Sequence, residues 1–487
     1  MMTQQDLEKY LWGAATALRG TIDAGDYKQY IFPLLFFKRI SDVYDEEFNN
    51  ALAESDGDLE YAAFAENHHF QVPDGAHWKD VRETTTNIGL ALQNAMREIE
   101  KANPDTLEGI FGDASWTNKD RLSDAMLTNL IEHYSQHTLD LKNVPDDKLG
   151  NAYEYLIKEF ADDSGHTAAE FYTNRTVVKL MTMIMDPQPG ESVYDPTCGS
   201  GGLLLNCALH LKDEGKEYRT LKLYGQEINL LTSAIARMNM FMHGIEEFDI
   251  VRGNTLSNPG LLENDELKKF NVILANPPYS IKSWDRKAFE SDPYGRNVWG
   301  TPPQGCADYA FQQHIQKSLD LGNGRSISLW PHGILFRDAE TEMRKKMIEQ
   351  DQVECVIGLG PNLFYNSPME ACLLITKTNK AESKKGKVLI INAVKEVRQD
   401  KNIAYLEQIH IKRIYNAYQN YADEDGFSKV VTTDEVLKHK ASLNMALYVS
   451  NVDSSKVQIS LDEALANWQT SSEQLSNSMD QLFKELG

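Results

Sequence analysis

Apolar residues recur at spacings of three and four along the first part of the chain. One such series comprises Leu7, Tyr10, Leu11, Ala14 and Leu18, and a second stretch runs from Tyr27 to Val43. This spacing places apolar side chains on one face of an amphipathic helix. The pattern predicts a helical N-terminal domain over residues 1–146, and the alternative is an extension that packs on the main domain.

From about residue 150 to 400 the pattern changes to short aliphatic or β-branched runs separated by amphipathic stretches. The runs predicted as strands are 192–194, 222–224, 272–275, 325–329, 355–359, 371–376 and 387–391. Strands that alternate with helical stretches are typical of βαβ units and a mostly parallel sheet. The sequence therefore predicts an α/β domain, which we place at residues 147–440.

The end of the chain repeats apolar positions at alternating spacings of four and three. The series is Leu461, Leu465, Trp468, Ser472, Leu475, Met479, Leu482 and Leu486. A repeat that averages 3.5 residues over several heptads indicates a coiled-coil seam. We predict a helical C-terminal tail, residues 441–487, that docks on another subunit; the alternative is a terminal helix packed on its own domain.

Composition agrees with a folded protein of two or three domains, since 41% of the 487 residues are hydrophobic and 25% are charged. The most apolar run, residues 31–37, is broken by Pro33 and is far shorter than the roughly 20 residues that span a bilayer. The first residues do not resemble a secretory signal. We expect a cytoplasmic protein without a membrane segment.

The cysteines indicate neither a disulfide framework nor a metal site. They are odd in number and widely spaced, at Cys198, Cys207, Cys306, Cys355 and Cys372. No CxxC pair or histidine stands at metal-ligand spacing from them, so we interpret them as reduced thiols and expect no metal.

A glycine-rich turn follows the predicted strand at 192–194. The segment VYDPTCGSGGLLL carries Asp195 at the strand end, then Gly199, Gly201 and Gly202, then an apolar helix start. Such glycines let the backbone turn sharply and approach a ligand, as in nucleotide-binding βαβ folds. Leu204 replaces the third glycine of the dinucleotide fingerprint, and the lysine of a Walker loop is missing. A structural turn would explain the glycines but not the acidic strand end.

A second carboxylate, Glu227 in LYGQEIN, follows the next predicted strand. Nucleoside-binding α/β proteins place a carboxylate at this distance on the ribose hydroxyls. A single glutamate at a strand end usually faces solvent, so its significance depends on Asp195 and the glycines. Together the two carboxylates suit a nucleoside better than a pyrophosphate.

The buried strand at 272–275 delivers Asn276, Pro277, Pro278 and Tyr279 at its carboxyl end. Two consecutive prolines cannot donate to a strand ladder, so they end the strand and stiffen the backbone. The order DPTCGSGG, GQEIN, NPPY resembles amino-group methyltransferases of nucleic acids and, more narrowly, the modification subunits of type I restriction-modification systems. The resemblance implies a Rossmann-like, S-adenosylmethionine-dependent domain that methylates the N6 amine of adenine in double-stranded DNA.

The adenine N6 lone pair is delocalised into the ring, so this amine is a poor nucleophile. By resemblance, the Asn276 side-chain oxygen and the Pro277 carbonyl accept hydrogen bonds from the amine, and Tyr279 stacks on the flipped base. The sulfonium of S-adenosyl-L-methionine is a good leaving group, so positioning and charge placement are the main demands on the protein. Cys198 lies in the glycine turn, away from the position of a cysteine nucleophile.

The segment DKLGNAYEYLIKEFADDSGHTAAEFYTNRTVV, residues 147–178, resembles the part that precedes the catalytic core in type I modification subunits, where EFYT lines the methionine end of the cofactor. The implied cofactor contacts are Glu170, Phe171, Tyr172, Thr173, Asn174, Arg175, Asp195, Thr197, Gly199, Ser200, Gly201, Gly202, Glu227 and Asn254. Asn174 replaces the usual proline, and Asn254 replaces a residue that is often acidic. Both keep an amide for hydrogen bonding, so they bear on affinity rather than on activity.

The resemblance continues through ADYAF (307–311), LWPHGILFR (329–337) and NLFYNSPMEACLLI (362–375), and so covers nearly the whole chain. Between Trp284 and Cys306 lies a loop that also contains Tyr294, Trp299 and three prolines. We interpret this loop either as a mobile flap over the flipped base or as an ordinary surface insertion.

A net charge of −23 is unfavourable for DNA binding, because Lys and Arg normally supply most of the affinity for phosphates. Either the basic groups gather on one face, or another subunit holds the DNA. The resemblance implies a separate specificity subunit, a second modification subunit and an ATP-dependent restriction subunit, since this chain has no Walker motif. Two alternatives remain: a protein glutamine N-methyltransferase, because NPPY also suits a side-chain amide, and a catalytically silent scaffold for the specificity subunit.

Overall fold

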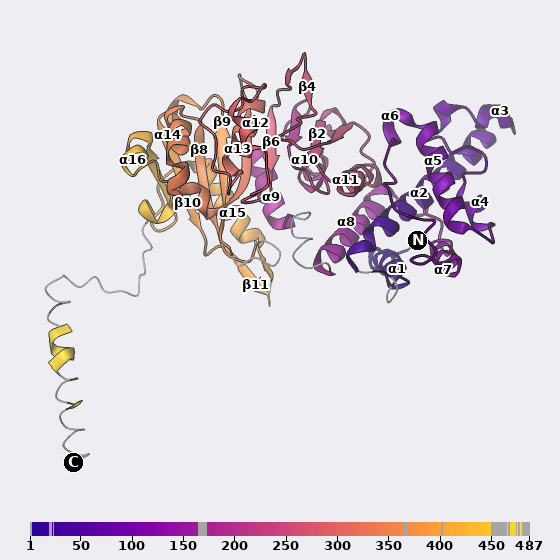
Figure 1. Ribbon diagram of the computed structural model, residues 1–487, viewed down its shortest axis with the longest axis horizontal. Coiled ribbons are helices and arrows are strands. Elements are labelled where there is room, and N and C mark those ends of the chain that lie inside the picture. Colours follow the sequence, from indigo (N-terminus) through magenta and orange to yellow (C-terminus); the bar gives the residue numbers. More distant parts are fainter. Residues whose placement is uncertain are drawn as a thin grey trace.

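The computed structural model describes residues 2–18, 22, 24–163, 173–363, 369–400 and 403–449, with residues 465, 468–473, 475, 478 and 479 of the tail. A helical body formed by the first part of the chain lies at one end of the molecule, and a sheet with its covering helices lies at the other (Figure 1). No helix in these ranges combines the length and hydropathy that crossing a bilayer requires.

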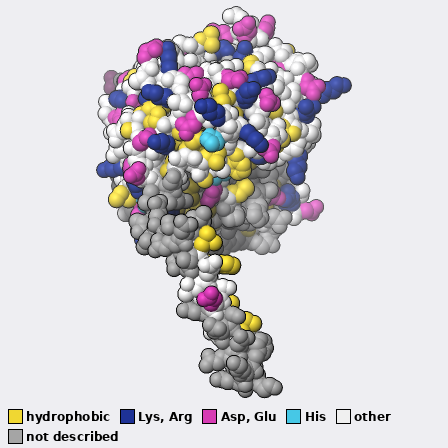
Figure 2. Space-filling view, turned by 90° about the vertical axis from the view of Figure 1, so that its left-hand side faces the viewer, with side chains coloured by type: hydrophobic (Ala, Val, Ile, Leu, Met, Phe, Trp, Pro, Cys, Tyr) yellow, Lys and Arg dark blue, Asp and Glu magenta, His cyan; other side chains and the backbone are white. Residues whose placement is uncertain are grey.

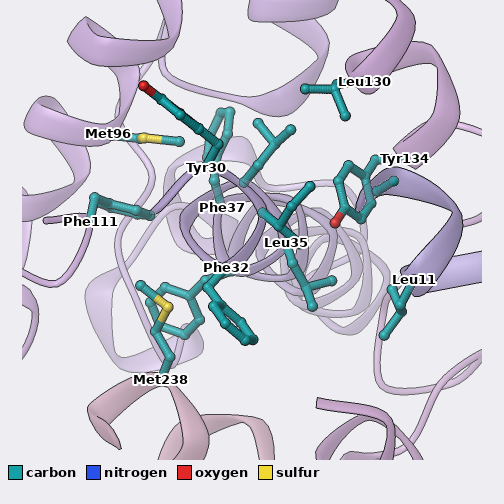
Figure 3. Close-up of a cluster of buried hydrophobic side chains, with 14 of the residues drawn as sticks. Leu11, Tyr30, Phe32, Leu35, Phe37, Met96, Phe111, Leu130, Tyr134 and Met238 are labelled. Atoms are coloured by element: carbon teal, nitrogen blue, oxygen red, sulfur yellow. The ribbon is translucent and has the colours of Figure 1, made fainter. Parts of the chain in front are cut away.

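The helical body is built around one long, buried helix. Its main helices are α1 (Gln4–Thr16), α2 (Lys28–Glu54), α5 (Ile88–Ala102), α7 (Asp124–Tyr134) and α8 (Asp146–Asp163), with shorter helices α3 (Leu59–Ala62), α4 (Trp78–Arg82) and α6 (Pro104–Leu107). Helix α2 is buried continuously from Tyr30 to Val43, and the charged residues in this span have partners: Lys38 pairs with Asp42, and Arg39 with Asp146. Figure 3 shows its side chains surrounded by residues of α1, α5 and α7.

The helical body and the α/β part share one apolar core. Met238 from α11 (Leu230–Met242) joins the cluster around α2, as Figure 3 shows. Helix α8 contributes Leu149, Tyr153 and Leu156 to the same cluster. The predicted helical region is therefore observed, and the domain boundaries at residues 146 and 440 stay predictions.

A nine-stranded sheet with the order β13-β10-β8-β9-β7-β6-β1-β2-β3 forms the centre of the α/β part. Its strands are β1 (Ser192–Asp195), β2 (Lys222–Glu227), β3 (Phe248–Arg252), β6 (Val272–Ala275), β7 (Arg325–Pro331), β8 (Val353–Leu359), β9 (Ala371–Lys377), β10 (Lys387–Ala393) and β13 (Ser428–Thr432). Strand β9 is antiparallel to β7 and β8, and β13 is antiparallel to β10; the other neighbours are parallel. All the strands predicted from the sequence are present, whereas β3 and β13 were not predicted.

Helices cover both faces of the sheet because successive strand residues point to opposite sides. Val193 packs with α9 (Arg175–Met185), α10 (Gly202–Asp213) and α15 (Gln408–Asn420). Tyr194 packs on the other face, which is covered by α13 (Asp308–Ser318), α14 (Thr341–Glu349) and α16 (Thr433–Lys438). Smaller elements are α12 (Arg286–Glu290) and the hairpins β4 (Leu262–Glu263)–β5 (Glu266–Leu267) and β11 (Arg398–Asp400)–β12 (Ile403–Tyr405).

The chain leaves β1 towards β2 and β3, and later returns on its other side through β6 and β7. Such a reversal of strand order opens a crevice at the carboxyl ends of the central strands, where ligands bind in open α/β sheets. The topology therefore predicts a ligand site among the loops that follow β1, β2, β3 and β6.

The described residues of the tail are helical and carry exposed apolar side chains. Leu465, Trp468, Leu475 and Met479 are 49%, 67%, 63% and 48% exposed. Leu461, Leu482 and Leu486 of the heptad series lie outside the described residues, so the coiled-coil seam stays a prediction.

Candidate active site

The glycine turn after β1 is held tightly against its neighbours. Asp195 ends β1 with 1% of its surface exposed, and the backbone N–H of Thr197 donates to its Oδ1 at 2.9 Å. Gly201 caps α10 with φ of +80°, and a Cβ there would come within 2.8 Å of Cε of Met240. This position therefore favours glycine for its backbone conformation, and a larger side chain would also displace the Met240 side chain.

Glu227, at the end of β2, fastens the turn after β1. Its carboxylate accepts hydrogen bonds from the N–H of Gly199 at 3.1 Å and of Asn229 at 2.8 Å. The loop after β3 joins the same arrangement, because the Thr255 hydroxyl donates to the Pro196 carbonyl at 2.5 Å. Three strand-end loops thus form one connected surface at the switch point of the sheet.

Asn254 lies in this surface, but its side-chain oxygen is turned towards its own backbone. Oδ1 accepts hydrogen bonds from the N–H of Leu256 at 2.9 Å and of Ser257 at 3.2 Å. The side chain can therefore offer a ligand its Nδ2 donor, whereas an aspartate would offer only acceptors.

Two hollows lie along this edge and share Thr197 and Asn276. The Glu227 hollow is lined by Pro196, Thr197, Gln226, Glu227, Ile228, Asn229, Asn254, Thr255, Leu256, Asn276, Pro278, Ile281, Ser283, Trp284 and Phe311. The Arg175 hollow is lined by Glu154, Ile157, Thr173, Arg175, Val178, Asp195, Thr197, Cys198, Gly199, Ser200, Gly202, Leu203, Asn206 and Asn276. Asn276 is therefore placed where the two hollows meet.

The Arg175 hollow contains an ion pair that sequence reasoning missed. The carboxylate of Glu154, from α8, lies 3.1 Å from the Arg175 guanidinium, and the Glu154 side chain is 11% exposed. The only signal for Glu154 in the sequence was its place within the segment at 147–178. The periodicity of apolar residues there indicates no more than a position on a helix. The pair presents both signs of charge at one end of the hollow.

Burial dominates the electrostatics of Asp195. The loss of solvent raises the pKa of this carboxyl to about 8; the hydrogen bond from the Thr197 N–H lowers it, and the nearby Glu227 charge raises it. The carboxyl is therefore largely protonated at neutral pH in the ligand-free chain. A cation bound beside it would favour the ionised form.

The turn after β6 orients the Asn276 amide. Its Nδ2 donates to the Thr173 hydroxyl at 3.0 Å, and the Tyr279 hydroxyl donates to its Oδ1 at 2.6 Å. Burial raises the pKa of Tyr279 well above its usual value, so its hydroxyl stays a donor. The amide therefore presents its oxygen on the Tyr279 side and its nitrogen on the Thr173 side.

Most of the predicted site residues that are described come together at this edge. Thr173, Arg175, Asp195, Thr197, Gly199, Ser200, Gly202, Glu227, Asn254, Asn276 and Pro278 line one or both hollows, and Pro277 and Tyr279 belong to the same turn. Gly201 supports the turn from behind, against Met240. Glu170, Phe171 and Tyr172 lie outside the described residues. The functional roles of all these residues stay predictions.

The side chain of Asn174 links α9 to a neighbouring hairpin. Its Oδ1 accepts from the Thr176 N–H at 3.0 Å and caps α9, while its Nδ2 donates to the Ala404 carbonyl at 2.9 Å. Both ends of the amide are engaged in joining α9 to the β11–β12 hairpin. In this structure Asn174 therefore lines neither hollow.

The loop at residues 284–306 is anchored by buried side chains. Arg296 is 2% exposed, pairs with Asp292 at 2.5 Å, and donates to the carbonyls of Thr255 at 2.8 Å and Leu256 at 2.7 Å. Trp299 is 1% exposed, and its backbone N–H donates to Gln313. A flap that moves as a whole would have to break these contacts, and both interpretations of the loop stay predictions. Trp284 lines the Glu227 hollow, and its Nε1 donates to the Gln304 carbonyl at 3.1 Å within the same loop.

Near the C-terminus of α10, ligand atoms of Asp186, His210 and Glu214 lie within 4.8 Å of one another. The Lys216 ammonium is 2.8 Å from Glu214 and 3.9 Å from Asp186, so a side-chain cation already lies beside both carboxylates. The expectation of no metal site stays a prediction.

Fold and site together define the class of this protein. The sheet is mostly parallel. A glycine turn follows the acidic end of β1, a carboxylate ends β2, and Asn-Pro-Pro-Tyr follows β6. This combination is typical of Rossmann-like methyltransferases that act on an amino group. The profile described as N-6 DNA Methylase matches residues 144–457, and the HsdM N-terminal domain matches residues 7–134. The chain belongs to the N-6 DNA methylase family and carries this helical N-terminal domain.

Curated relatives extend over most of the chain. The type I restriction enzyme MjaVIII methylase subunit of Methanocaldococcus jannaschii is 30% identical over 88% of this chain and 75% of the relative. The MpnII methylase subunit of Mycoplasma pneumoniae is 29% identical over 91% of this chain and 89% of the relative. The crystal structure of a type I restriction-modification methyltransferase subunit from Streptococcus thermophilus is 30% identical, covers 92% of this chain and 100% of its own, and superposes with a TM-score of 0.80.

These similarities confirm the main prediction from the sequence, that of an adenine-specific DNA methyltransferase of the type I modification-subunit kind. The predicted fold class, a Rossmann-like domain with a helical N-terminal domain, is confirmed as well. Neither the protein glutamine methyltransferase nor the silent scaffold is favoured.

Proposed function

We propose that this chain transfers the methyl group of S-adenosyl-L-methionine to the N6 amine of a flipped adenine in double-stranded DNA. The observation that carries the proposal is the position of Asn276 where the two hollows meet, with its oxygen on the Tyr279 side. An amine brought to this turn lies beside a side-chain acceptor, a backbone carbonyl and an aromatic ring.

The chemistry of the two hollows fits the cofactor. The Glu227 carboxylate and the Asn254 amide suit the ribose and adenine of the nucleoside. The Arg175 guanidinium suits the carboxylate of the methionine part, and Glu154 suits its ammonium group. The Asp195 carboxyl, buried and of raised pKa, is complemented by the positive charge of the sulfonium. When bound, the cofactor would supply an electrophilic methyl group.

The residues at Asn276 prepare the amine and hold it in place. Asn276 Oδ1 and the Pro277 carbonyl accept its two N–H groups, which draws the nitrogen towards tetrahedral geometry and frees its lone pair. With S-adenosyl-L-methionine held in the two hollows, its methyl group would be the electrophile for this lone pair, and the amine would give up one proton to water. Neither acceptor is a strong base, so positioning and fixed dipoles supply the catalysis.

The net charge and the distribution of charged side chains suggest that the chain binds DNA as one subunit of a larger assembly. Figure 2 shows basic and acidic side chains intermixed on the face at the β13 end of the sheet, and the net charge is −23. We therefore infer that a specificity subunit supplies most contacts to DNA phosphates and bases. The exposed tail positions Trp468 and Leu475 dock on that subunit. A second modification subunit and an ATP-dependent restriction subunit complete the assembly, in the cytoplasm.

The test is methyl transfer by the chain co-expressed and purified with its specificity subunit. Labelled S-adenosylmethionine should methylate unmodified DNA, and the product should be N6-methyladenine at one recurring sequence. Asn276→Ala should abolish transfer while cofactor binding persists. Label found in protein instead of DNA would support glutamine methylation, and an Asn276→Ala variant as active as wild type would refute the assigned role.

A further inference from the structure

Two segments were singled out in the sequence, ADYAF (307–311) and LWPHGILFR (329–337), and so far only Phe311 of the first has been placed, in the lining of the Glu227 hollow. The structure brings Asp308 of the first and Arg337 of the second to the turn that follows the Asn276–Tyr279 motif. Asp308 lies 28 positions after Ser280 and 29 before Arg337, and the three residues meet directly beside the proposed reaction centre.

Ser280, the residue after the motif, has φ of +52°. This left-handed conformation is unfavourable for a residue with a Cβ and persists only where its surroundings hold it. The Ser280 N–H donates to Oδ1 of Asp308 at 2.8 Å. Asp308 thus holds one end of the turn, while Thr173 holds the Asn276 amide at the other end.

The Asp308 carboxylate is fully buried and depends on Arg337 for its charge balance. The Arg337 guanidinium donates to Oδ2 of Asp308 at 2.6 Å and to Glu340 at 2.8 Å. The side chains of Asp308 and Glu340 are 0% and 1% exposed, whereas Arg337 is 29% exposed. Burial disfavours the charged guanidinium, but its two carboxylate partners outweigh this and raise the pKa of Arg337. A buried carboxylate without such a partner would be strongly destabilised.

We propose that Asp308 and Arg337 are positioning residues for methyl transfer. Asp308 keeps Ser280 in its left-handed conformation and so fixes the direction in which the Pro277 carbonyl and the Tyr279 ring face the target base. Arg337 keeps the Asp308 carboxylate oriented by binding its second oxygen. The inference rests on the proposed function, because it concerns the geometry of that same reaction.

The geometry separates this role from cofactor binding. Asp308 and Arg337 line neither the Glu227 hollow nor the Arg175 hollow as the described residues define them. A loosened turn should therefore slow methyl transfer without lowering the affinity for the cofactor. Misplacement of reacting groups by about 1 Å is enough to lower a rate about a hundredfold.

The experiment compares variants of the full chain in complex with its specificity subunit. Asp308→Asn keeps the shape of the side chain but has one acceptor oxygen in place of two, so it cannot accept from both the Ser280 N–H and Arg337. We expect its single-turnover rate at saturating DNA and cofactor to fall about a hundredfold, with the dissociation constant for S-adenosylmethionine unchanged. Arg337→Lys keeps a positive charge near Asp308 but loses the planar fork to Glu340, so its rate should fall less.

Glu354→Gln is the matched control. Glu354 is a carboxylate with 0% exposure, paired with Lys377 at 2.9 Å and Lys384 at 2.6 Å near the start of β8, away from the turn. It should lower the melting temperature, as Asp308→Asn does, while the methylation rate stays at the wild-type value.

The outcomes are distinct. A wild-type complex that methylates no DNA refutes the proposed function itself. A wild-type complex that is active, together with Asp308→Asn at the wild-type rate, overturns the positioning role alone. The role also fails if Glu354→Gln loses as much rate as Asp308→Asn. If Asp308→Asn does not fold, the positioning role is tested instead with Arg337→Lys, by the same measurements of rate and cofactor affinity.

Discussion

The Asp195 carboxyl is expected to release a proton when the cofactor binds. Burial raises its pKa to about 8, so about one molecule in ten carries the ionised form at pH 7 and about nine in ten at pH 9. If the ionised carboxylate is the form that binds the cationic sulfonium, apparent affinity increases with pH through this range. The expected gain from pH 7 to pH 9 is about tenfold, or about 1.4 kcal/mol.

Isothermal titration with S-adenosylmethionine between pH 6.5 and 9 measures this dependence directly. S-adenosylhomocysteine, which lacks the sulfonium charge, is the matched ligand and should show a shallower slope. Asp195→Asn cannot ionise, so its affinity should lose most of the dependence on pH. An affinity that is flat or falls with pH in the wild type, or an equal slope in Asp195→Asn, would refute the reasoning.

Three further predictions follow from the site and the tail. Tyr279→Phe removes the hydroxyl that occupies the Asn276 oxygen and keeps the ring, so methylation should be at least as fast as in the wild type. Tyr279→Ala should weaken stacking by about 1–3 kcal/mol and slow the reaction; equal rates for the two variants would contradict the stacking role. Arg296→Met leaves the Asp292 charge buried and unpaired, so we expect a loss of about 3–5 kcal/mol in stability by chemical denaturation and weaker cofactor binding by titration. An unchanged dissociation constant would limit Arg296 to a structural role. Trp468→Ser should abolish co-purification with the specificity subunit at an unchanged melting temperature, whereas a lower melting temperature would show that the tail packs on its own chain.

Much of the fold could be predicted because its signals are local. The seven predicted strands, from 192–194 to 387–391, are short apolar runs bounded by polar turns, and each is present. Strands β3 and β13 were missed because they lie at the edges of the sheet, where half-exposed residues weaken the apolar run. Parallel strands bring their carboxyl ends to one edge, so Asp195, Glu227 and Asn276 could be expected to meet there.

Other parts of the site depend on partners far apart in the chain. Arg175 pairs with Glu154, and Asp308 holds Ser280 and binds Arg337. The loop at 284–306 could be interpreted from its sequence only as a flap or a surface insertion, because nothing local shows that Arg296 is buried. Asn174 looked like a cofactor contact by its place in a motif, yet in the structure both of its polar atoms join α9 to a distant hairpin.

The sequence by itself determined the seven inner strands of the sheet, the N-terminal helical region and the three strand-end motifs, because periodicity and turn residues act over a few neighbouring positions. Only the tertiary structure decided which charged and polar groups become partners. A buried carboxylate or guanidinium is stable only where an opposite charge or a backbone group meets it, and that partner is set by the packing of the whole chain.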